Sequence, residues 1–600
     1  RPMYFSQVRV DPSDDRWLFV LGVSMAKSSD GGDTFTNDAG PGVHADQHAL
    51  WIDPRDGRHM IVGCDGGVYQ TYDRGAHWDH LNFAAIGQFY DVALDPRADY
   101  WVYGGLQDNG SWGAPHRAER GSGAINEDWI RVGSGDGFNV EVDPNDPLLI
   151  YFESQNGSTG RTHLGTMESG STRARPGRNE RLRYNWKTPF ILSAHNSRIY
   201  YNAGNFVFRS LDRGNDLKKI SPEITRTDRG SATSLAESPR NADVLYVGSD
   251  DGALFGTRDG GHTWTDLWPL PATSEISTAE ASAGKGEGGG VASLAALVPG
   301  PRWVSTVEAS RFAEGRAYLA LDGHRSDDDE PYVFATEDFG KSWRSLRSNL
   351  PTGSTRFLRE DIRNENLLYL GTEFGFWISI DRGQSWTRFH GRLPTVAVHD
   401  VAQHPTNGDV VLGTHGRSLW SFDATTLRQM SAEIVGKSAH LFDPDDVIMW
   451  RSRHRRASSG ARAFAGDAPS SDATIHVHFA RDVGSAALRI VGTDGKIFRE
   501  LTVPTTAGLH RVAWDLRSTP PASQAAEPRG DRTFARGGSR GRTASPGVWR
   551  VELEVNGEVQ AHDFEVLPDP ILGAAPTTGR FGDEDAVTDL EFDTAVGRDR

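Results

Sequence analysis

The sequence contains almost no cysteine and no long hydrophobic run. Its single cysteine, Cys64, cannot form a disulfide within the chain, so cysteine usage does not reveal the redox state of the compartment. The longest apolar run, residues 291–298, is too short to cross a bilayer, so we expect no transmembrane segment. Lysine is scarce, with 8 residues against 56 arginines, which we interpret as a compositional bias without functional meaning.

The sequence also lacks a recognisable signal peptide, but its first residues already follow a strand-like pattern. We therefore expect a truncated amino terminus, and the missing signal says nothing about localisation. The net charge of −17 argues against nucleic acid as the main partner, because phosphate binding needs a basic surface. No stretch keeps a 3.6-residue apolar period, whereas glycine (67) and tryptophan (17) are abundant, which favours many short strands joined by turns.

One eight-residue pattern recurs along the chain: Ser/Thr-x-Asp-x-Gly-x-Ser/Thr-Trp/Phe. It is complete at residues 28–35, 257–264, 336–343 and 379–386, nearly complete at 71–78 and decayed at 210–214. The pattern is typical of a hairpin turn, in which the Asp carboxylate accepts backbone N–H bonds and glycine supplies a positive φ. The closing aromatic residue is expected to pack between neighbouring sheets. We therefore interpret its aspartates as structural: Asp30, Asp73, Asp212, Asp259, Asp338 and Asp381.

The spacing of these aspartates predicts the fold. Intervals of 43, 47 and 43 residues indicate a unit of about 45 residues, and four strands per unit of that length are typical of propeller blades. Units are expected to start near residues 88, 138, 189, 232, 304, 356 and 397. The fold class is therefore all-β, with a seven-bladed β-propeller at 85–427. Residues 1–84 are expected to hold the last two blades of an incomplete first propeller.

A different pattern follows the propeller. Residues 428–470 are expected to be a linker, and residues 471–568 show the strand length and alternation of an immunoglobulin- or fibronectin-like β-sandwich. The loop 519–546 and the tail 569–600 are expected to be loosely ordered. The glycine-rich insertion 269–301 is expected to be a spacer, with a lid over the propeller as the alternative.

These motifs resemble a known group of bacterial proteins. The Asp-boxes, together with residues 104–112, 133–138 and 413–417, resemble BNR-repeat proteins described as sortilin/VPS10-like, WD40/YVTN-like or glycosyl hydrolase. Residues 512–516 and 546–549 resemble the FlgD-type immunoglobulin domain of secreted bacterial proteins. The resemblance implies two propellers and an export signal, hence a secreted, periplasmic or cell-surface location. A single cysteine excludes the cysteine-rich module of sortilin. The sequence also lacks the Phe-Arg-Ile-Pro motif of sialidases, which argues against that activity.

The resemblance to two-propeller xyloglucanases suggests one catalytic residue. Those enzymes place one Asp on each propeller, and Asp136 lies in a similar Gly-Asp-Gly-Phe context just before an expected inner strand. Its glycine neighbours are expected to leave the carboxylate open to act as an acid or base beside a sugar. The alternative is a turn aspartate ordered by its own backbone.

His44, Asp46 and His48 recur at every second position. On a strand they would share one face and could hold a divalent cation, or instead form a buried hydrogen-bonded cluster or line a channel. No other cofactor is expected.

The expected inner strands and their ends are unusually polar. Because inner strands line the central channel of a propeller, these residues could bind a ligand or form an ion-pair network between blades. They are Asp91, Gln107, Asp108, Asn109, Glu141, Glu308, Arg359, Glu360, Glu373, His399, Asp400, His415 and Arg417, with Glu237, Gln155 and Asn156 beside them. Candidates for stacking on sugars are Trp101, Trp112, Trp129 and Trp186.

Three functions remain open from the sequence, the third being an assembly scaffold that binds no small ligand. The first is an exported, monomeric propeller that binds a polysaccharide, peptide or protein through one face, with the sandwich as a stalk. The second is a glycoside hydrolase acting between two propellers, with Asp136 as one catalytic carboxylate. Propeller architecture alone cannot decide between binding and catalysis.

Overall fold

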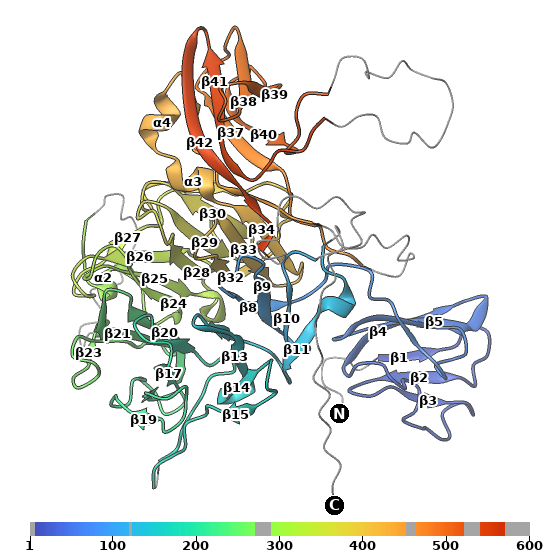
Figure 1. The fold of residues 1–600 in the computed structure, drawn as a ribbon. Helices are drawn as coiled ribbons and strands as arrows, with labels where there is room; N and C mark the ends of the chain where they lie inside the picture. The colour runs from blue at the N-terminus through green and yellow to red at the C-terminus, as the bar shows by residue number, and fades with distance from the viewer. Residues whose placement is uncertain are drawn as a thin grey trace, which may run out of the picture.

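The computed structural model describes residues 7–118, 123–178, 180–269, 290–451, 464–520 and 541–570, and these residues form an all-β chain (Figure 1). In this part of the chain no helix is long and apolar enough to span a membrane. Most of the insertion 269–301, the loop 519–546 and the tail 569–600 lies outside the described residues.

The chain begins with two antiparallel sheets that share one core. Phe19 and Leu21 of the first sheet pack with Leu50 and Met60 of the second. Their strands are β1 (Gln7–Val10), β2 (Leu18–Leu21) and β3 (Ala26–Ser28), then β4 (Gln47–Asp53), β5 (Asp56–Cys64), β6 (Gly67–Thr71) and β7 (Asp79–His80). We call residues 7–84 the first unit.

Seven further sheets follow in chain order among the described residues. Their first strands start within two residues of the predicted positions. The strands are β8 (Phe89–Leu94), β9 (Trp101–Leu106), β10 (Gly110–Pro115), β11 (Ile130–Gly133); β12 (Val140–Asp143), β13 (Asp146–Ser154), β14 (Ser158–His163), β15 (Ser169–Ser171); β16 (Phe190–Leu192), β17 (Tyr200–Ala203), β18 (Val207–Ser210), β19 (Lys218–Lys219); β20 (Ala232–Ser238), β21 (Asn241–Ser249), β22 (Leu254–Thr257), β23 (Thr265–Asp266); β24 (Trp303–Ala309), β25 (Ala317–Asp322), β26 (Tyr332–Thr336), β27 (Arg344–Ser345); β28 (Thr355–Glu360), β29 (Leu368–Thr372), β30 (Gly375–Ser379), β31 (Thr387–Arg388); and β32 (Val398–Gln403), β33 (Asp409–Thr414), β34 (Leu419–Asp423).

The seventh sheet packs against the first, so the series closes into a ring. The backbone N–H of Val92 donates to Asp400 at 3.3 Å, and the Tyr100 hydroxyl donates to Asp409 at 3.1 Å. This radial arrangement of antiparallel sheets is a β-propeller, as the repeats predict. The second strand of most sheets is buried on both faces, for example Ala317–Asp322, because each sheet is covered by a neighbour on either side.

The eight-residue turns form the bonds that their chemistry predicts. Around Asp259, the carboxylate accepts from the Thr263 N–H at 2.8 Å and from the Thr263 hydroxyl at 2.6 Å. The closing Trp264 donates its indole N–H to Ile220 of the preceding sheet at 2.8 Å. The decayed turn differs, because Asp212 accepts from Asn215 and Arg198 instead. These turns join the third and fourth strands, at the opposite end of the sheets from the start of the inner strands.

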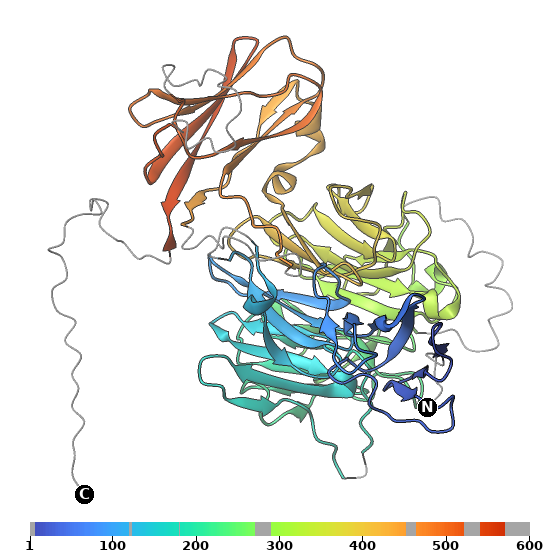
Figure 2. The same ribbon diagram turned by 90° about the vertical axis from the view of Figure 1, so that its right-hand side faces the viewer.

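Two more sheets form a β-sandwich after the ring, which Figures 1 and 2 show as a separate lobe in orange and red. Its core contains Ile475, Trp514, Val551 and Phe564, all buried. One sheet contains β35 (Ala439–Leu441), β37 (Ala473–Phe479) and β40 (Gly508–Trp514), and the other contains β36 (Val447–Met449), β42 (Glu558–Pro568), β41 (Gly547–Val555), β38 (Ala486–Val491) and β39 (Ile497–Leu501).

The segment 428–470, expected as a linker, is partly structured. It holds the end of α3 (Thr425–Gln429), then α4 (Ala432–Gly436), and two strands that pair with the sandwich. The linker prediction is therefore wrong for this part, and the sandwich begins before residue 471. Three-residue strands bounded by Asp and Pro carry too little alternation to be recognised from the sequence. Residues 452–463, the central part of this segment, lie outside the described residues.

Candidate functional site

The first strand of each sheet is its inner strand, and the inner strands begin at one end of the ring, which we call the mouth. Five of them begin with a register shift, as at Phe89/Asp91 and Val398/Asp400. The loop before β12 is fixed there by backbone contact between glycines. A Cβ atom on Gly105 would lie 2.1 Å from the carbonyl oxygen of Phe138, and one on Gly137 would lie 2.4 Å from that of Gly110. Only residues without a side chain allow this approach.

Asp136 lies in this loop and is buried, with only 6% of its surface exposed. The sequence predicted an open carboxylate, and this is wrong, because the glycines draw the backbones together and enclose it. Burial raises the pKa of Asp136, and the neighbouring Asp108 carboxylate raises it further. The pKa of Asp108 is also raised, mainly by burial and then by Asp65, while Gln107 lowers it. The Asp136 carboxyl lowers the pKa of Asp108 while Asp108 raises that of Asp136, so of the two it is Asp136 whose proton the pairing holds more tightly.

The first unit brings a third carboxylate to the mouth. Asp65 lies after β5, and its backbone carbonyl accepts a hydrogen bond of 3.0 Å from Asn109. Its carboxylate is 2.7 Å from Nε2 of His48. Sequence analysis missed Asp65, because nothing in the pattern of the first unit indicates that its loop 65–66 touches the ring.

Tyr90 connects the carboxylate loops to a histidine pair. Its hydroxyl donates to Gln107 at 2.6 Å, and Gln107 donates to Asp108 at 2.8 Å. The ring centroids of Tyr90 and His415 lie 4.7 Å apart. His415 stacks on His399, with ring centroids 4.2 Å apart and an angle of 4° between the ring planes. Burial lowers the pKa of both histidines and raises that of Tyr90 to about 12. The histidines are therefore neutral near pH 7.

Other predicted residues border the mouth without joining this group. Glu373 pairs with Arg356, which also binds Asp322 at 2.5 Å. Arg417 is exposed and only its backbone is anchored, by the Thr414 hydroxyl at 3.0 Å. Asn156 adopts a left-handed conformation in the loop after β13.

The four candidate tryptophans have different environments. Trp186, in the loop before β16, is 49% exposed, so it offers an aromatic surface beside the mouth. Trp112 donates its indole N–H to Asn109 at 2.6 Å, while Trp101 packs at the edge of a core cluster between two sheets. Trp129 is half-buried after a short 3₁₀ turn, Asn126–Asp128. Of the four, only Trp186 is both exposed and at the mouth.

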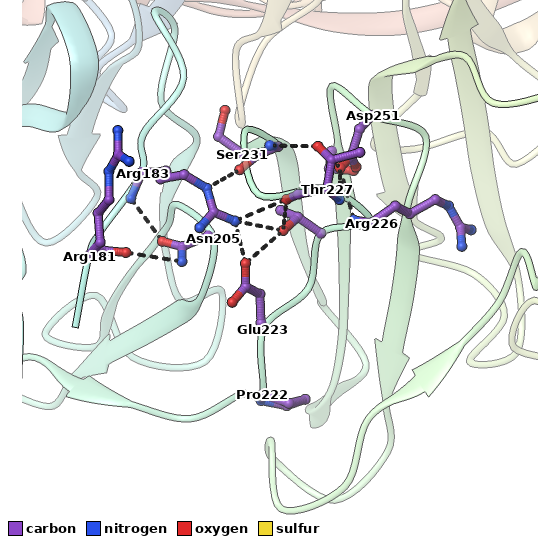
Figure 3. A network of polar contacts seen from close by, with 12 residues as sticks. Arg181, Arg183, Asn205, Pro222, Glu223, Arg226, Thr227, Ser231 and Asp251 are labelled. Atoms are coloured by element: carbon purple, nitrogen blue, oxygen red, sulfur yellow. Dashed lines mark hydrogen bonds and ion pairs between the residues drawn. The ribbon is translucent and has the colours of Figure 1, made fainter. Parts of the chain in front are cut away.

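The loop between β19 and β20 lies at the same end of the ring and is held by a network of polar contacts (Figure 3). The Arg183 side chain donates to the Gly230 carbonyl at 3.0 Å and pairs with Glu223. Asp251 accepts from the backbone N–H groups of Arg226 and Thr227, each at 2.8 Å. Because the Arg183 side chain and the backbone N–H groups of Arg226 and Thr227 all bind protein acceptors, we interpret the network as structural support for the rim of the mouth.

Inside the channel, five of the predicted charged residues come together. Arg359 pairs with Glu308 at 3.4 Å and with Asp400 at 3.2 Å, while Asp91 pairs with Lys187 at 3.6 Å. For Glu141 the described residues show no ion pair or hydrogen bond through the side chain. It lines a cavity of about 310 Å³ together with Glu308, Arg311 and Arg359.

The channel holds more carboxylates than cations, and burial raises the pKa of these carboxyl groups. Desolvation raises the pKa of Asp91 to about 7, of Glu141 to about 8 and of Glu308 to about 7. Repulsion between neighbouring carboxylates adds to the first two. At neutral pH several of these groups therefore keep a proton.

Glu360 joins two neighbouring sheets of the ring. It is fully buried and accepts from Ser310, from the Arg311 N–H and from the Tyr318 hydroxyl, all on the preceding sheet. Glu237 repeats this arrangement, accepting from Ser193, the Ala194 N–H and the Tyr201 hydroxyl. Both glutamates end an inner strand, and both tie one sheet to the one before it.

The predicted metal ligands do not share a strand face. β4 begins at Gln47, after His44 and Asp46, and Asp46 adopts a left-handed φ of 60°. A register shift between Gln47 and Ala49 displaces His48 as well. The alternation that the prediction required is therefore lost, and in the described residues no group of three or more His, Cys, Asp or Glu could hold a metal ion.

Comparison with known proteins gives little beyond this geometry. No protein-family model and no curated protein matches the chain. Among solved structures, the chain is similar to a GH74 enzyme from Niastella koreensis, with 14% sequence identity, coverage of 84% of this chain and 74% of that chain, and a TM-score of 0.25. A TM-score this low defines no residue-by-residue correspondence between the two sites.

Proposed function

We propose that the protein binds a polysaccharide at the mouth of the propeller. The observation that carries this proposal is the convergence of Asp65, Asp108 and Asp136 from two parts of the chain at the mouth. Carboxylates and amides such as Gln107 offer hydrogen-bond partners for sugar hydroxyls. The exposed Trp186 beside them offers a flat apolar surface for a sugar ring.

A second candidate function is hydrolysis, and the raised pKa of Asp136 favours it. A raised pKa lets a carboxyl group hold its proton to higher pH, as a general acid requires. Asp108 is unsuited as its partner, because carboxyl groups across a glycosidic bond lie about 5–9.5 Å apart, whereas these two are hydrogen-bonded. In this alternative, Asp65 of the first unit would supply the second carboxylate.

Asp136→Asn distinguishes the two functions. The variant and the parent protein would be tested for binding and turnover on β-glucans, xyloglucan and sialosides, with Asp33→Asn, an exposed position in the first unit, as the control. If the protein is a hydrolase, we expect turnover by the parent and a loss of about 10²-fold or more in the variant. Glycan binding without turnover supports a binding protein. Absence of both binding and turnover would contradict both proposals and leave a peptide or protein ligand.

The finer assignments from the sequence belong to the same proposal. The ring is proposed to be of the BNR type and the sandwich of the FlgD-like immunoglobulin type, serving as a stalk. The protein is proposed to act as a monomer at the bacterial cell surface or outside the cell.

A further inference from the structure

The channel contains a cavity of about 310 Å³ that lies toward the end of the ring opposite the mouth. Its walls come from the second halves of the inner strands, such as residues 235–237 of β20 and residues 307–309 of β24. The mouth residues Asp65, Asp108 and Asp136 are not part of its lining. A cavity of this size can enclose a small organic ligand.

Arg359 is surrounded in the channel by four carboxylates of inner strands, Asp91, Glu141, Glu308 and Asp400. Three of the four bind protein groups in the same way. Each accepts a backbone N–H group of the next inner strand at 3.2–3.3 Å and lies within 3.6 Å of a Lys or Arg nitrogen. The N–H donors to Asp91, Asp400 and Glu308 are those of Val140, Val92 and Glu360, respectively.

Glu141 is the exception among these four carboxylates. It lies on β12, and the next inner strand, β16, has only three residues and donates no hydrogen bond to it among the described residues. No ion pair to its side chain is present in that part of the chain either, and the side chain lines the cavity. Burial raises the pKa of Glu141 to about 8, with further contributions from Asp91 and Asp400. Near neutral pH, Glu141 therefore keeps a proton in place of a cationic partner.

The channel lacks positive charge beside Glu141. Only Lys187 and Arg359 pair with the other three carboxylates. Arg311, a further cation of the lining, acts on Glu308 from an exposed position in the turn after β24. A bound cation next to Glu141 would replace its proton and let the carboxylate ionise.

The lining of the cavity favours an organic cation over a metal ion. Among the described residues, no group of three or more His, Cys, Asp or Glu is placed to hold a metal. Much of the wall is aliphatic, and an alkyl chain gains free energy by burying its apolar surface there. An ammonium group adds one positive charge and three N–H donors for carboxylate oxygens. The aliphatic side chains of the wall are Ile191, Leu192, Leu235, Val307, Ile362 and Val401.

We propose that the channel cavity binds a primary alkylammonium ion, with its nitrogen at the Glu141 carboxylate and its alkyl chain against the aliphatic wall. The ammonium keeps its own protons, and Glu141 releases its proton to the solvent when the ligand binds near neutral pH. The site is separate from the polysaccharide site proposed at the mouth and does not rest on it.

Calorimetric titration of the full chain with n-butylammonium chloride tests this site. The neutral ligand n-butanol and the inorganic cation potassium are titrated in parallel at constant ionic strength. We expect binding of n-butylammonium alone, with release of a proton at pH 7 that is measured in two buffers of different ionisation enthalpy.

The affinity for n-butylammonium should rise with pH. Between pH 6.5 and 8.5 Glu141 loses its proton, as do Asp91 and Glu308, whose pKa values are raised to about 7, whereas an alkylammonium stays charged. The other charged groups around Glu141 are Asp400, Arg359 and Lys187. We therefore expect binding to be about tenfold or more tighter at pH 8.5 than at pH 6.5.

Glu141→Gln separates the charge of this residue from its shape. The variant should fold, because it removes a buried ionisable group, and should bind n-butylammonium about tenfold or more weakly at pH 8.5. Glu500→Gln, at an exposed position in the sandwich, is the control and should bind like the parent. Absence of n-butylammonium binding by the parent, equal binding of n-butanol or potassium, or undiminished binding by Glu141→Gln would each overturn the proposal. Polysaccharide binding by the same proteins is measured separately and reports on the mouth alone.

Discussion

Burial changes the acidity of the carboxyl groups that the inner strands place in the channel. Glu141 is the clearest case, because its pKa rises to about 8 and the described residues include no cationic partner within ion-pair distance of it. Asp91 and Glu308 differ in that each lies within 3.6 Å of a cation, yet their pKa values still rise to about 7. The number of cations in the channel is therefore too small to balance its carboxylates.

This imbalance predicts a dependence of stability on pH. Between the pKa of an unfolded glutamate and about 8, the folded protein binds the Glu141 proton more tightly than the unfolded chain does, so stability falls as pH rises. Glu141→Gln should remove this loss and raise the free energy of unfolding by up to about 5 kcal/mol at pH 8.5, with little effect at pH 4. Urea denaturation at both pH values measures it. An unchanged pH dependence in Glu141→Gln would show that Glu141 ionises freely in the folded protein.

At the scale of the element, the eight-residue turn is held by its aspartate. Asp259 accepts three hydrogen bonds through its side chain and closes the hairpin between β22 and β23. The same bonds recur at Asp338 and Asp381. The turn thus holds the outer strand of each sheet against the third strand, and this outer strand is only two residues long in several sheets.

Removal of one such aspartate should loosen a single sheet. We expect Asp259→Ala to lower the free energy of unfolding, because the N–H and hydroxyl donors that close the turn lose their acceptor. Asp33→Ala is the control, since Asp33 is an exposed residue of an equivalent turn, and the described residues show no hydrogen bond to its side chain. Calorimetry of both variants measures the difference. Equal losses in the two variants would contradict a special role for the third position of the turn.

At the scale of the whole molecule, contacts distant in sequence complete both the mouth and the sandwich. The first unit contributes Asp65 to the mouth, and the Asn126 side chain donates to the Asn82 carbonyl of that unit at 3.1 Å. In the sandwich, β35 and β36 come from the segment that connects it to the ring. The ring therefore depends on residues of the first unit, and the sandwich depends on residues of the segment that precedes it.

The sandwich should require that connecting segment to be stable. A fragment of residues 437–570 should unfold at a higher urea concentration than one of residues 471–570, because the shorter fragment lacks β35 and β36 and with them Leu441, whose side chain is fully buried in the core. Circular dichroism of both fragments during urea titration measures the difference. Equal midpoints would show that the two short strands add nothing to the fold.

The sequence by itself determined the propeller, because each turn and each strand is specified within about 45 residues and repeats. The starts of the seven inner strands and the clustering of Asp91, Glu141, Glu308, Arg359 and Asp400 follow from that period alone. Only the tertiary structure decided that Asp136 is enclosed beside Asp108, that Asp65 joins them, and that Glu360 binds the preceding sheet. Those features depend on contacts between residues far apart in sequence and on burial, and neither leaves a periodic signal in the chain.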